Sequence, residues 1–226
     1  MDRRTFLRNS VLGAAAVTLV PLGLRGQIAK RAMKPGRLNL SFTPHELHLR
    51  HAFNLAKSSR TVTPDMLVRI EFDGIIGYGE ASMPPYLGES AKSVCNFLSQ
   101  LDLTQFNDPF RIGEIHRYMD IVSNGNYAAK CAVDIALHDI VGKITGQPWH
   151  RMGGLSAADA PCTSFTIGID TPEVVRQKVQ EASPYRVLKV KMGLDRDKET
   201  VELIRSMTDV PICADVNQGW IDRKMA

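Results

Sequence analysis

The chain has 226 residues, of which 44% are hydrophobic and 23% charged, a composition typical of a soluble globular protein with one large domain or two modest ones. Its formal net charge of +4 comes mainly from four arginines among residues 1–26, so the nearly neutral remainder indicates neither a nucleic-acid partner nor an anionic membrane surface. The four cysteines form no CxxC pair, which argues against a zinc ribbon or disulfide framework, and three in apolar stretches are expected to be buried thiols: Cys131, Cys162 and Cys213.

Residues 1–34 predict a targeting signal and linker. "MDRRTFLRNS" is a basic head with the pair Arg3-Arg4, and "VLGAAAVTLVPLGL" is an apolar run of 14 residues, too short to span a bilayer comfortably. A basic head before a short apolar run is typical of secretory signals, and the arginine pair indicates the twin-arginine route. We therefore expect an exported, periplasmic protein without stable membrane insertion. A cytoplasmic protein with an amphipathic N-terminal helix is the alternative.

Residues 35–158 predict a domain in which strands precede helices. The segments "RLNLSF", "HELHLRHAF" and "DMLVRIEFDGIIGYGEA" indicate strands, with the polar segment "NLAKSSRTVTP" between the second and the third. Asp73-Gly74 predicts a hairpin turn between two alternating runs. After an expected loop at residues 82–90, apolar residues recur at helical spacing in three segments: 91–101, 109–122 and 126–145. Gly146 and Pro148 supply the stop for the last helix.

Residues 159–226 change to an alternation of strands and helices. "CTSFTIGI", "RVLKVKMG" and "VPICADV" indicate strands, whereas "TPEVVRQKVQEA" and "DRDKETVELIRSM" indicate helices, the first with Thr171 as N-cap and Pro172 after it. This alternation predicts βαβ units on a parallel sheet. Three parallel strands would leave an exposed edge and a half-covered core, so we expect the sequence to be the N-terminal portion of a longer protein.

Lys189 and Lys191 lie two residues apart on a predicted strand, so their side chains point to the same face. Buried strands of parallel sheets are usually continuous apolar runs, and active sites of α/β barrels lie at the carboxyl ends of the strands. A lysine pair at this place is therefore costly unless it is functional. Adjacent ammonium groups lower each other's pKa, which suits a general base near neutral pH. A half-exposed strand with solvated lysines explains the pattern equally well.

Asp215 and Asn217 close the next predicted strand, in "ADVNQGW", and are again two residues apart. A carboxylate and an amide are hard oxygen donors that suit Mg²⁺. The alternative is an Asx turn that ends the strand. One carboxylate alone does not make a metal site.

Together, these features resemble the mandelate racemase/muconate-lactonizing branch of the enolase superfamily over residues 35–226. The resemblance rests on four stretches in the same order: "GYGEA", "AAKCAVDIALHDIVGKITGQPWHRMGG", "KVKMG" and "ADVNQGW". It implies an α/β fold class, in which an α+β capping domain (residues 35–158) is followed by the first part of a modified TIM-type (β/α) barrel (residues 159–226), truncated after about three strands.

The resemblance also implies a Mg²⁺-assisted reaction that removes and returns an α-proton through an enolate. Lys191 resembles the base on one face, Lys189 its partner, and Asp215 the first of three metal carboxylates. Within the branch, the chain is similar to dipeptide epimerases of the L-Ala-D/L-Glu type. The resemblance groups three residues as substrate-binding: Asn217, Thr166 in "TSFTIGIDTPE", and Arg60 in "SSRTV", which matches an arginine that binds the substrate's distal carboxylate.

The function expected for the parent protein is dipeptide epimerisation, with a small-molecule dipeptide as the partner and no nucleic acid. Two groups of alternatives stay open: another enzyme of the branch (a cycloisomerase, a racemase of N-acylated amino acids or an acid-sugar dehydratase) or a non-catalytic fragment. The other metal carboxylates and a second-face lysine are expected after residue 226, so the chain alone is expected to be inactive. A homo-oligomer of the full-length form is left open. For Arg60, a solvated loop charge is the alternative.

Overall fold

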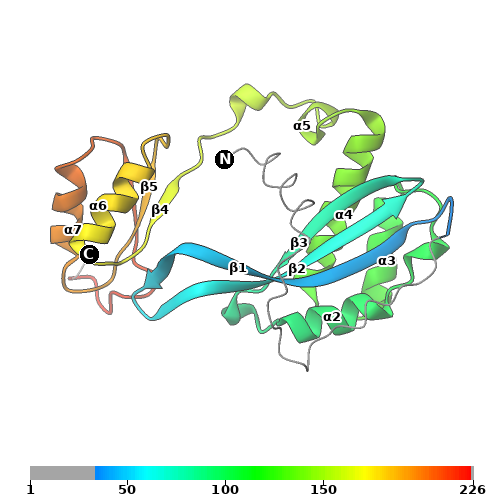
Figure 1. The fold of residues 1–226 in the computed structure, drawn as a ribbon, viewed down its shortest axis with the longest axis horizontal. Helices are drawn as coiled ribbons and strands as arrows, with labels where there is room; N and C mark the ends of the chain where they lie inside the picture. The colour runs from blue at the N-terminus through cyan, green and yellow to red at the C-terminus, as the bar shows by residue number, and fades with distance from the viewer. Residues whose placement is uncertain (1–33, 225–226) are drawn as a thin grey trace, which may run out of the picture.

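A computed structural model describes residues 34–224, which form two units joined by a linker and by a long hairpin (Figure 1). Apart from residue 34, the predicted targeting segment lies outside the described residues. Within the described part of the chain, no helix has both the length and the apolar character needed to cross a bilayer. The two units carry the strands and helices that position the candidate site.

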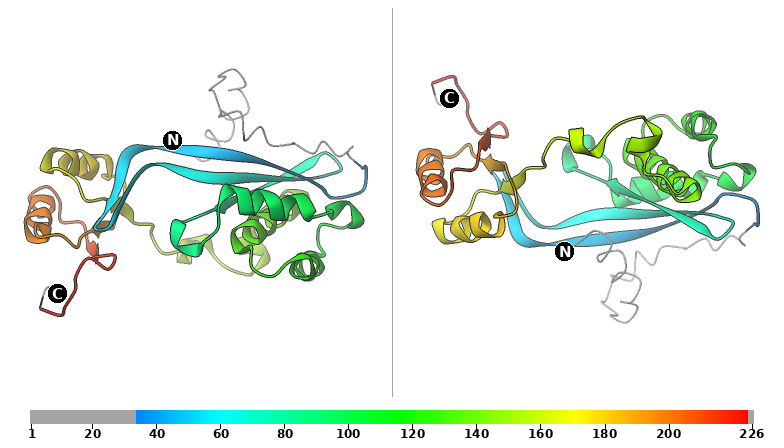
Figure 2. Two further views of the ribbon diagram at one scale, coloured as in Figure 1. Left: turned by 90° about the horizontal axis from the view of Figure 1, so that it is seen from below. Right: turned by 90° about the horizontal axis from the view of Figure 1, so that it is seen from above.

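The first unit is an antiparallel sheet covered on one side by helices (Figure 2). Its strands, in the order β1-β2-β3, are β1 (Asn39–Leu55), β2 (Ser58–Phe72) and β3 (Ile75–Ser82). The helices that follow are η1 (Pro85–Leu87), α2 (Ala91–Gln100), η2 (Leu103–Gln105), α3 (Ile112–Val122), α4 (Tyr127–Thr145), α5 (Trp149–Met152) and η3 (Ala157–Asp159). The helices predicted over 91–101, 109–122 and 126–145 are confirmed as α2, α3 and α4.

The turn predicted at Asp73-Gly74 is confirmed. Phe72 pairs with Ile75, and both turn residues have positive φ, 47° for Asp73 and 81° for Gly74. This conformation matches the twist of a two-residue hairpin and is readily adopted by Gly and tolerated by Asp. The turn holds β2 and β3 in a register that buries one face of β3 beneath α4.

The polar segment expected to separate two strands belongs to the strands themselves. β1 continues to Leu55 and β2 begins at Ser58, so only residues 56 and 57 form the turn between them. Arg60 therefore lies on a strand, not in a loop. A hairpin that projects beyond the core has no buried face to require alternating apolar residues, so the polar composition misled the prediction. Figure 1 shows this hairpin reaching the second unit.

Two glycines of β3 allow α4 to lie directly on the sheet. A Cβ atom on Gly79 would meet the carbonyl oxygen of Ala132 at 1.8 Å, and one on Gly77 would meet that of Ala136 at 2.1 Å. The alanines on α4 are fully buried at this contact. Close packing of this kind leaves no space for a methyl group, because protein interiors are packed as densely as organic crystals.

The second unit is a parallel sheet in the order β4-β5-β6. Its elements in chain order are β4 (Phe165–Ile167), α6 (Pro172–Glu181), β5 (Leu188–Lys191), α7 (Asp197–Arg205) and β6 (Ile212–Asp215). A small core joins the sheet to the two helices through Ile167, Val190, Val175 and Ile204. The predicted fold class is confirmed: an α+β capping domain is followed by strands alternating with helices on a parallel sheet.

The prediction of three buried cysteines is wrong. Cys131, Cys162 and Cys213 are all exposed free thiols. Cys131 lies on the side of α4 turned away from the sheet, Cys162 lies in the linker before β4, and Cys213 lies on β6 at the edge of the parallel sheet. An apolar neighbourhood in the sequence does not say which face of a helix or strand is covered.

Replacement of Gly79 by alanine should destabilise the fold by about 3 kcal/mol or more, because the added methyl group overpacks the contact between β3 and α4. Urea unfolding followed by circular dichroism measures the change. The matched control is Gly113→Ala on α3, where the added Cβ would meet only the Arg117 guanidinium at 3.8 Å. Helix propensity predicts a neutral effect or a gain of up to about 1 kcal/mol for the control. Equal stability of the two variants would contradict the close packing.

A second prediction concerns Asp65, a residue of β2 that is only 2% exposed. Burial, together with the neighbouring Glu80 carboxylate, raises the pKa of Asp65 from 3.8 to about 7. The folded protein therefore binds a proton there that the unfolded chain releases above pH 4, so this stabilisation is lost as the pH rises through 7. Between pH 5 and pH 8 the loss should be on the order of 1–3 kcal/mol.

Asp65→Asn should remove most of that decline, since an amide does not titrate. Urea unfolding of the wild type and the variant at pH 5 and at pH 8 measures the difference. Asp195→Asn, at an exposed aspartate, is the matched control and should keep the wild-type decline. If Asp65→Asn declines as steeply as the wild type, Asp65 is not the group that releases the proton.

Candidate active site

The candidate site lies on the face of the parallel sheet opposite helices α6 and α7. In the parallel register Thr166 of β4 pairs with Lys189 of β5, and Lys191 pairs with Asp215 of β6. Paired residues of neighbouring strands project to the same face, and so do residues two apart on one strand. These four side chains therefore share one face, and Asp215 stands at the carboxyl end of its strand.

The Asp215 carboxylate forms an ion pair with each of the two lysines. Its Oδ2 atom lies 2.8 Å from the Lys191 Nζ and 3.0 Å from the Lys189 Nζ. The Lys191 side chain is 9% exposed, whereas that of Lys189 is 39% exposed. The two ammonium groups thus share one counter-ion, with Lys191 at its buried side and Lys189 toward solvent.

This counter-ion reverses the electrostatic effect expected at Lys189. Hydrogen bonds from Lys191 and then from Lys189 hold the pKa of the Asp215 carboxyl well below its usual range. The hydrogen bond to Asp215, together with the negative charge of that group, raises the pKa of Lys189. The prediction that the neighbouring ammonium lowers this pKa is wrong, because the sequence pattern did not place a carboxylate between the two amines.

Asn217 reaches the same point from a turn after the strand. β6 ends at Asp215, and Asn217 has a left-handed backbone with φ of 43°. Its backbone N–H donates to the Asp215 Oδ1 at 3.0 Å, the geometry of an Asx turn. Its side-chain Oδ1 accepts a hydrogen bond from the Lys191 Nζ at 2.7 Å. The Asx turn given as the alternative explanation of this motif is therefore present, and the role of Asp215 as a metal ligand stays a prediction.

The hairpin of the capping domain supplies an aromatic ring to this group. Phe53 lies on β1 with its ring centre 5.8 Å from the Lys191 Nζ. Arg60 pairs with Phe53 across the hairpin, and its guanidinium carbon lies 5.0 Å from the same ring centre. The ring thus lies within the range of cation–π attraction of both a strand lysine and an exposed hairpin arginine.

The structure brings together five of the six residues singled out from the sequence. Lys189 and Lys191 both contact Asp215, and Asn217 contacts Lys191 and Asp215. Arg60 joins this group through the Phe53 ring. Thr166 shares their face and is half-buried beside Lys189 in the register. Phe53 was missed, because one aromatic residue in an alternating strand gives no sign that its hairpin folds onto another unit.

The donors at the site suit a divalent cation in kind but not in number. Asp215 and Asn217 present oxygen atoms of the type that Mg²⁺ accepts. However, no three or more His, Cys, Asp or Glu side chains between residues 34 and 224 are grouped so as to hold a metal ion. Asp215 can therefore be one ligand of a metal ion, and the other ligands would have to come from outside the described residues.

Comparison with known proteins shows which protein family this chain is related to. The family model of the mandelate racemase/muconate lactonizing enzyme N-terminal domain matches residues 39–154, about half of the chain. The L-Ala-D/L-Glu epimerase of Bacteroides thetaiotaomicron is 56% identical over 192 residues, which cover 84% of this chain and 50% of the relative. The chain spans about half the length of the curated relatives it matches.

Solved structures agree with this relationship. The N-succinyl Arg/Lys racemase from Bacillus cereus is 31% identical with a TM-score of 0.70, over 81% of this chain and 53% of that one. The dipeptide epimerase from Methylococcus capsulatus complexed with Mg and L-Arg-D-Lys is 26% identical with a TM-score of 0.72, over 82% and 55%. The resemblance seen in the sequence is confirmed, and the chain belongs to the mandelate racemase/muconate lactonizing enzyme family of the enolase superfamily.

Proposed function

We propose that this chain supplies the capping domain and the first barrel strands of a dipeptide epimerase, which removes and returns the α-proton of one residue of a dipeptide. The observation that carries the proposal is the convergence of Lys189, Lys191 and Asp215 on one face of the parallel sheet. The 56% identity to the L-Ala-D/L-Glu epimerase of Bacteroides thetaiotaomicron supports dipeptides as the substrate class.

In the proposed reaction the neutral amine of Lys191 is the base on one face of the substrate, so Lys191 must first give up the proton with which it donates to Asp215. Its Nζ lies at the buried side of the Asp215 carboxylate, near the Phe53 ring, and its side chain is largely shielded from solvent. Lys189 keeps a second positive charge at the more exposed side, near the negative charge that forms as the proton leaves. Epimerisation also needs a group on the opposite face, and we place that group outside this chain.

We further propose Mg²⁺ as the cofactor, with Asp215 as one of its ligands. A bound Mg²⁺ would stabilise the developing enolate as a Lewis acid. The dipeptide epimerase from Methylococcus capsulatus was solved with Mg, which supports this choice of cation. Because Asp215 is held by two ammonium groups in the described residues, the cation would compete with Lys189 and Lys191 for the same carboxylate.

Arg60, Thr166 and Asn217 are the proposed substrate-binding residues. Arg60 is exposed on the hairpin above the lysines, and a guanidinium binds a carboxylate through two parallel hydrogen bonds. Arg60 would therefore select a dipeptide in which the side chain of one residue carries a carboxylate, as in glutamate. Thr166 lines the face beside Lys189, and the Asn217 amide lies next to the base.

A second candidate function is racemisation of N-acylated amino acids. The TM-score of 0.70 and 31% identity to the N-succinyl Arg/Lys racemase favour it, since both reactions begin with removal of an α-proton. The racemase named in this comparison acts on N-succinyl derivatives of Arg and Lys, so its substrates differ from L-Ala-Glu dipeptides in the N-acyl group and in the charge of the side chain. Turnover of N-succinyl-amino acids in place of dipeptides would select this alternative.

We propose export by the twin-arginine route to the periplasm, which rests on the Arg3-Arg4 head and the apolar run after it. Cytoplasmic retention is the alternative. Fractionation of cells that express the protein, with Arg3→Lys/Arg4→Lys as the comparison, tests it: the wild type should appear in the periplasm and the double variant should not.

The experiment for the proposed function follows α-proton exchange in the enzyme that carries this chain and a complete barrel. L-Ala-L-Glu in D₂O with Mg²⁺ should gain deuterium at an α-carbon, as seen by loss of its proton NMR signal. Lys191→Met should reduce the exchange rate by about 10²–10⁴-fold for the epimer, L-Ala-L-Glu or L-Ala-D-Glu, whose α-proton faces Lys191, which is the usual contribution of a general base. Lys198→Met, at a lysine of α7 that is 84% exposed, is the matched control and should keep the wild-type rate.

An undiminished exchange rate in Lys191→Met with both epimers, L-Ala-L-Glu and L-Ala-D-Glu, would remove this residue from the reaction. Absence of exchange with dipeptides of every charge type would refute the epimerase. The 226-residue chain alone, tested with the same substrate and Mg²⁺, should show no exchange above background, because its described residues supply a single carboxylate at the site.

A further inference from the structure

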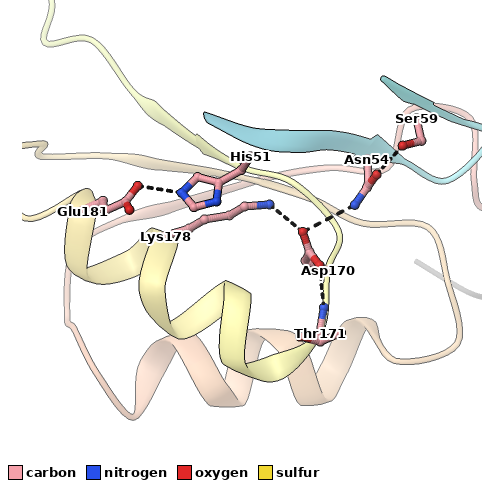
Figure 3. A network of polar contacts seen from close by, with 7 residues as sticks. All are labelled: His51, Asn54, Ser59, Asp170, Thr171, Lys178 and Glu181. Atoms are coloured by element: carbon pink, nitrogen blue, oxygen red, sulfur yellow. Dashed lines mark hydrogen bonds and ion pairs between the residues drawn. The ribbon is translucent and has the colours of Figure 1, made fainter. Parts of the chain in front are cut away.

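A polar network joins the tip of the hairpin to the parallel sheet and helix α6 (Figure 3). Its centre is Asp170, in the loop between β4 and α6. The Asp170 Oδ2 accepts a hydrogen bond from the Lys178 Nζ at 2.9 Å and one from the Asn54 Nδ2 at 3.4 Å. On the other strand of the hairpin, the Ser59 Oγ donates to the Asn54 Oδ1 at 2.5 Å.

Lys178 is unusual because its ammonium is buried. Its side chain is 4% exposed, and Asp170 is the acidic partner that holds it. Burial of an ammonium is costly unless it is paired and hydrogen-bonded. The carboxylate that satisfies Lys178 is also the acceptor for Asn54, so an ion pair within the barrel unit anchors a residue of the capping domain.

Two further contacts fix the same hairpin. The backbone N–H of Ile169 donates to the carbonyl oxygen of Asn54 at 3.1 Å. Farther along β1, the His51 Nε2 lies 2.8 Å from the Glu181 Oε2 at the end of α6. The hairpin is therefore held at two points, one at its tip and one nearer the capping domain, both against α6 and the loop that precedes it.

The alternation of strand side chains links these contacts to the candidate active site. Asn54 pairs with Ser59, and the neighbouring pair is Phe53 with Arg60. Adjacent residues on a strand project to opposite faces. One face of the hairpin tip thus contacts Asp170, while the next pair places the Phe53 ring near Lys191 and the Arg60 guanidinium over that ring.

We propose that Asn54, Asp170 and Lys178 form a hairpin latch, which positions Arg60 for selection of an acidic dipeptide. The three are positioning residues: they touch neither Lys191 nor Asp215 in the described structure and act through the placement of the hairpin. The selection of substrate rests on the proposed epimerase function, whereas the docking of the hairpin does not. Removal of the latch should free the hairpin tip and leave the lysine–aspartate group of the barrel in place.

The docking is tested by amide hydrogen exchange in this chain, resolved by residue with NMR. In Asn54→Ala the Ile169 amide should exchange about 10-fold faster, because the loss of one charge-assisted hydrogen bond favours the undocked hairpin by about that factor. Ser59→Ala, which removes only the brace on Asn54, should give a smaller increase. Asn39→Ala, the same change at the other end of β1, is the matched control and should leave the Ile169 rate unchanged.

The Phe165 amide, which donates to Val187 within the barrel unit, reports whether that unit stays folded. Its exchange should be the same in all variants. An Ile169 rate in Asn54→Ala equal to that of the wild type would overturn the latch. Faster exchange at Phe165 as well as at Ile169 would also overturn it, because the variant would then act by unfolding the barrel unit.

The second arm uses the enzyme with a complete barrel. Asn54→Ala should raise KM for L-Ala-L-Glu about 10-fold with kcat changed less than about 3-fold, since a misplaced Arg60 loses ground-state and transition-state binding alike. KM for L-Ala-L-Leu, whose second residue has no side-chain carboxylate, should change less than about 2-fold. Equal effects on both substrates would overturn selection through Arg60. If the wild type turns over no dipeptide, the proposed function and this selection fail together, and the exchange rates still decide the docking.

Discussion

Two ammonium groups on one face of a strand repel each other, and the Asp215 carboxylate allows Lys189 and Lys191 to occupy that face together. Both ammonium groups lie within hydrogen-bond distance of the same carboxylate oxygen atom, the Asp215 Oδ2. The cluster keeps one net positive charge, and the more exposed Lys189 carries its ammonium toward solvent while Lys191 stays paired at the buried side. Every proposed step of the chemistry depends on this arrangement, because it sets where a base, a counter-charge and a metal ligand meet.

Carboxyl groups in this chain behave oppositely according to their neighbours. Asp215, between two ammonium groups, has its pKa well below the usual range. Asp65, buried beside Glu80, has its pKa raised to about 7. An aspartate side chain is thus ionised at neutral pH in one unit and partly protonated at neutral pH in the other. Neighbouring ammonium groups stabilise the ionised form, whereas burial and a neighbouring carboxylate destabilise it. Only the Asp215 environment suits a metal ligand, which must be deprotonated.

The capping domain contributes to the site through a hairpin that leaves its own core. The glycines of β3 let α4 approach closely, so the sheet is held firmly at one end while β1 and β2 extend beyond it. At the far end, Asn54 meets Asp170 and Phe53 meets Lys191. Because the sheet is packed against α4 at one end and the hairpin tip is docked at the other, side chains from the two units meet at the proposed site, as expected of a site built between domains.

The sequence by itself determined which residues share a face and where the chain turns. The two-residue spacing placed Lys189 with Lys191, the Asp73-Gly74 pair predicted its turn, and helical spacing located α4, because these features depend on local geometry. Only the tertiary structure decided what covers each face. It exposed Cys131, turned the polar segment around Arg60 into paired strands, and placed the Phe53 ring over Lys191. Periodicity describes one element at a time, whereas burial and charge pairing arise from contacts between elements far apart in the sequence.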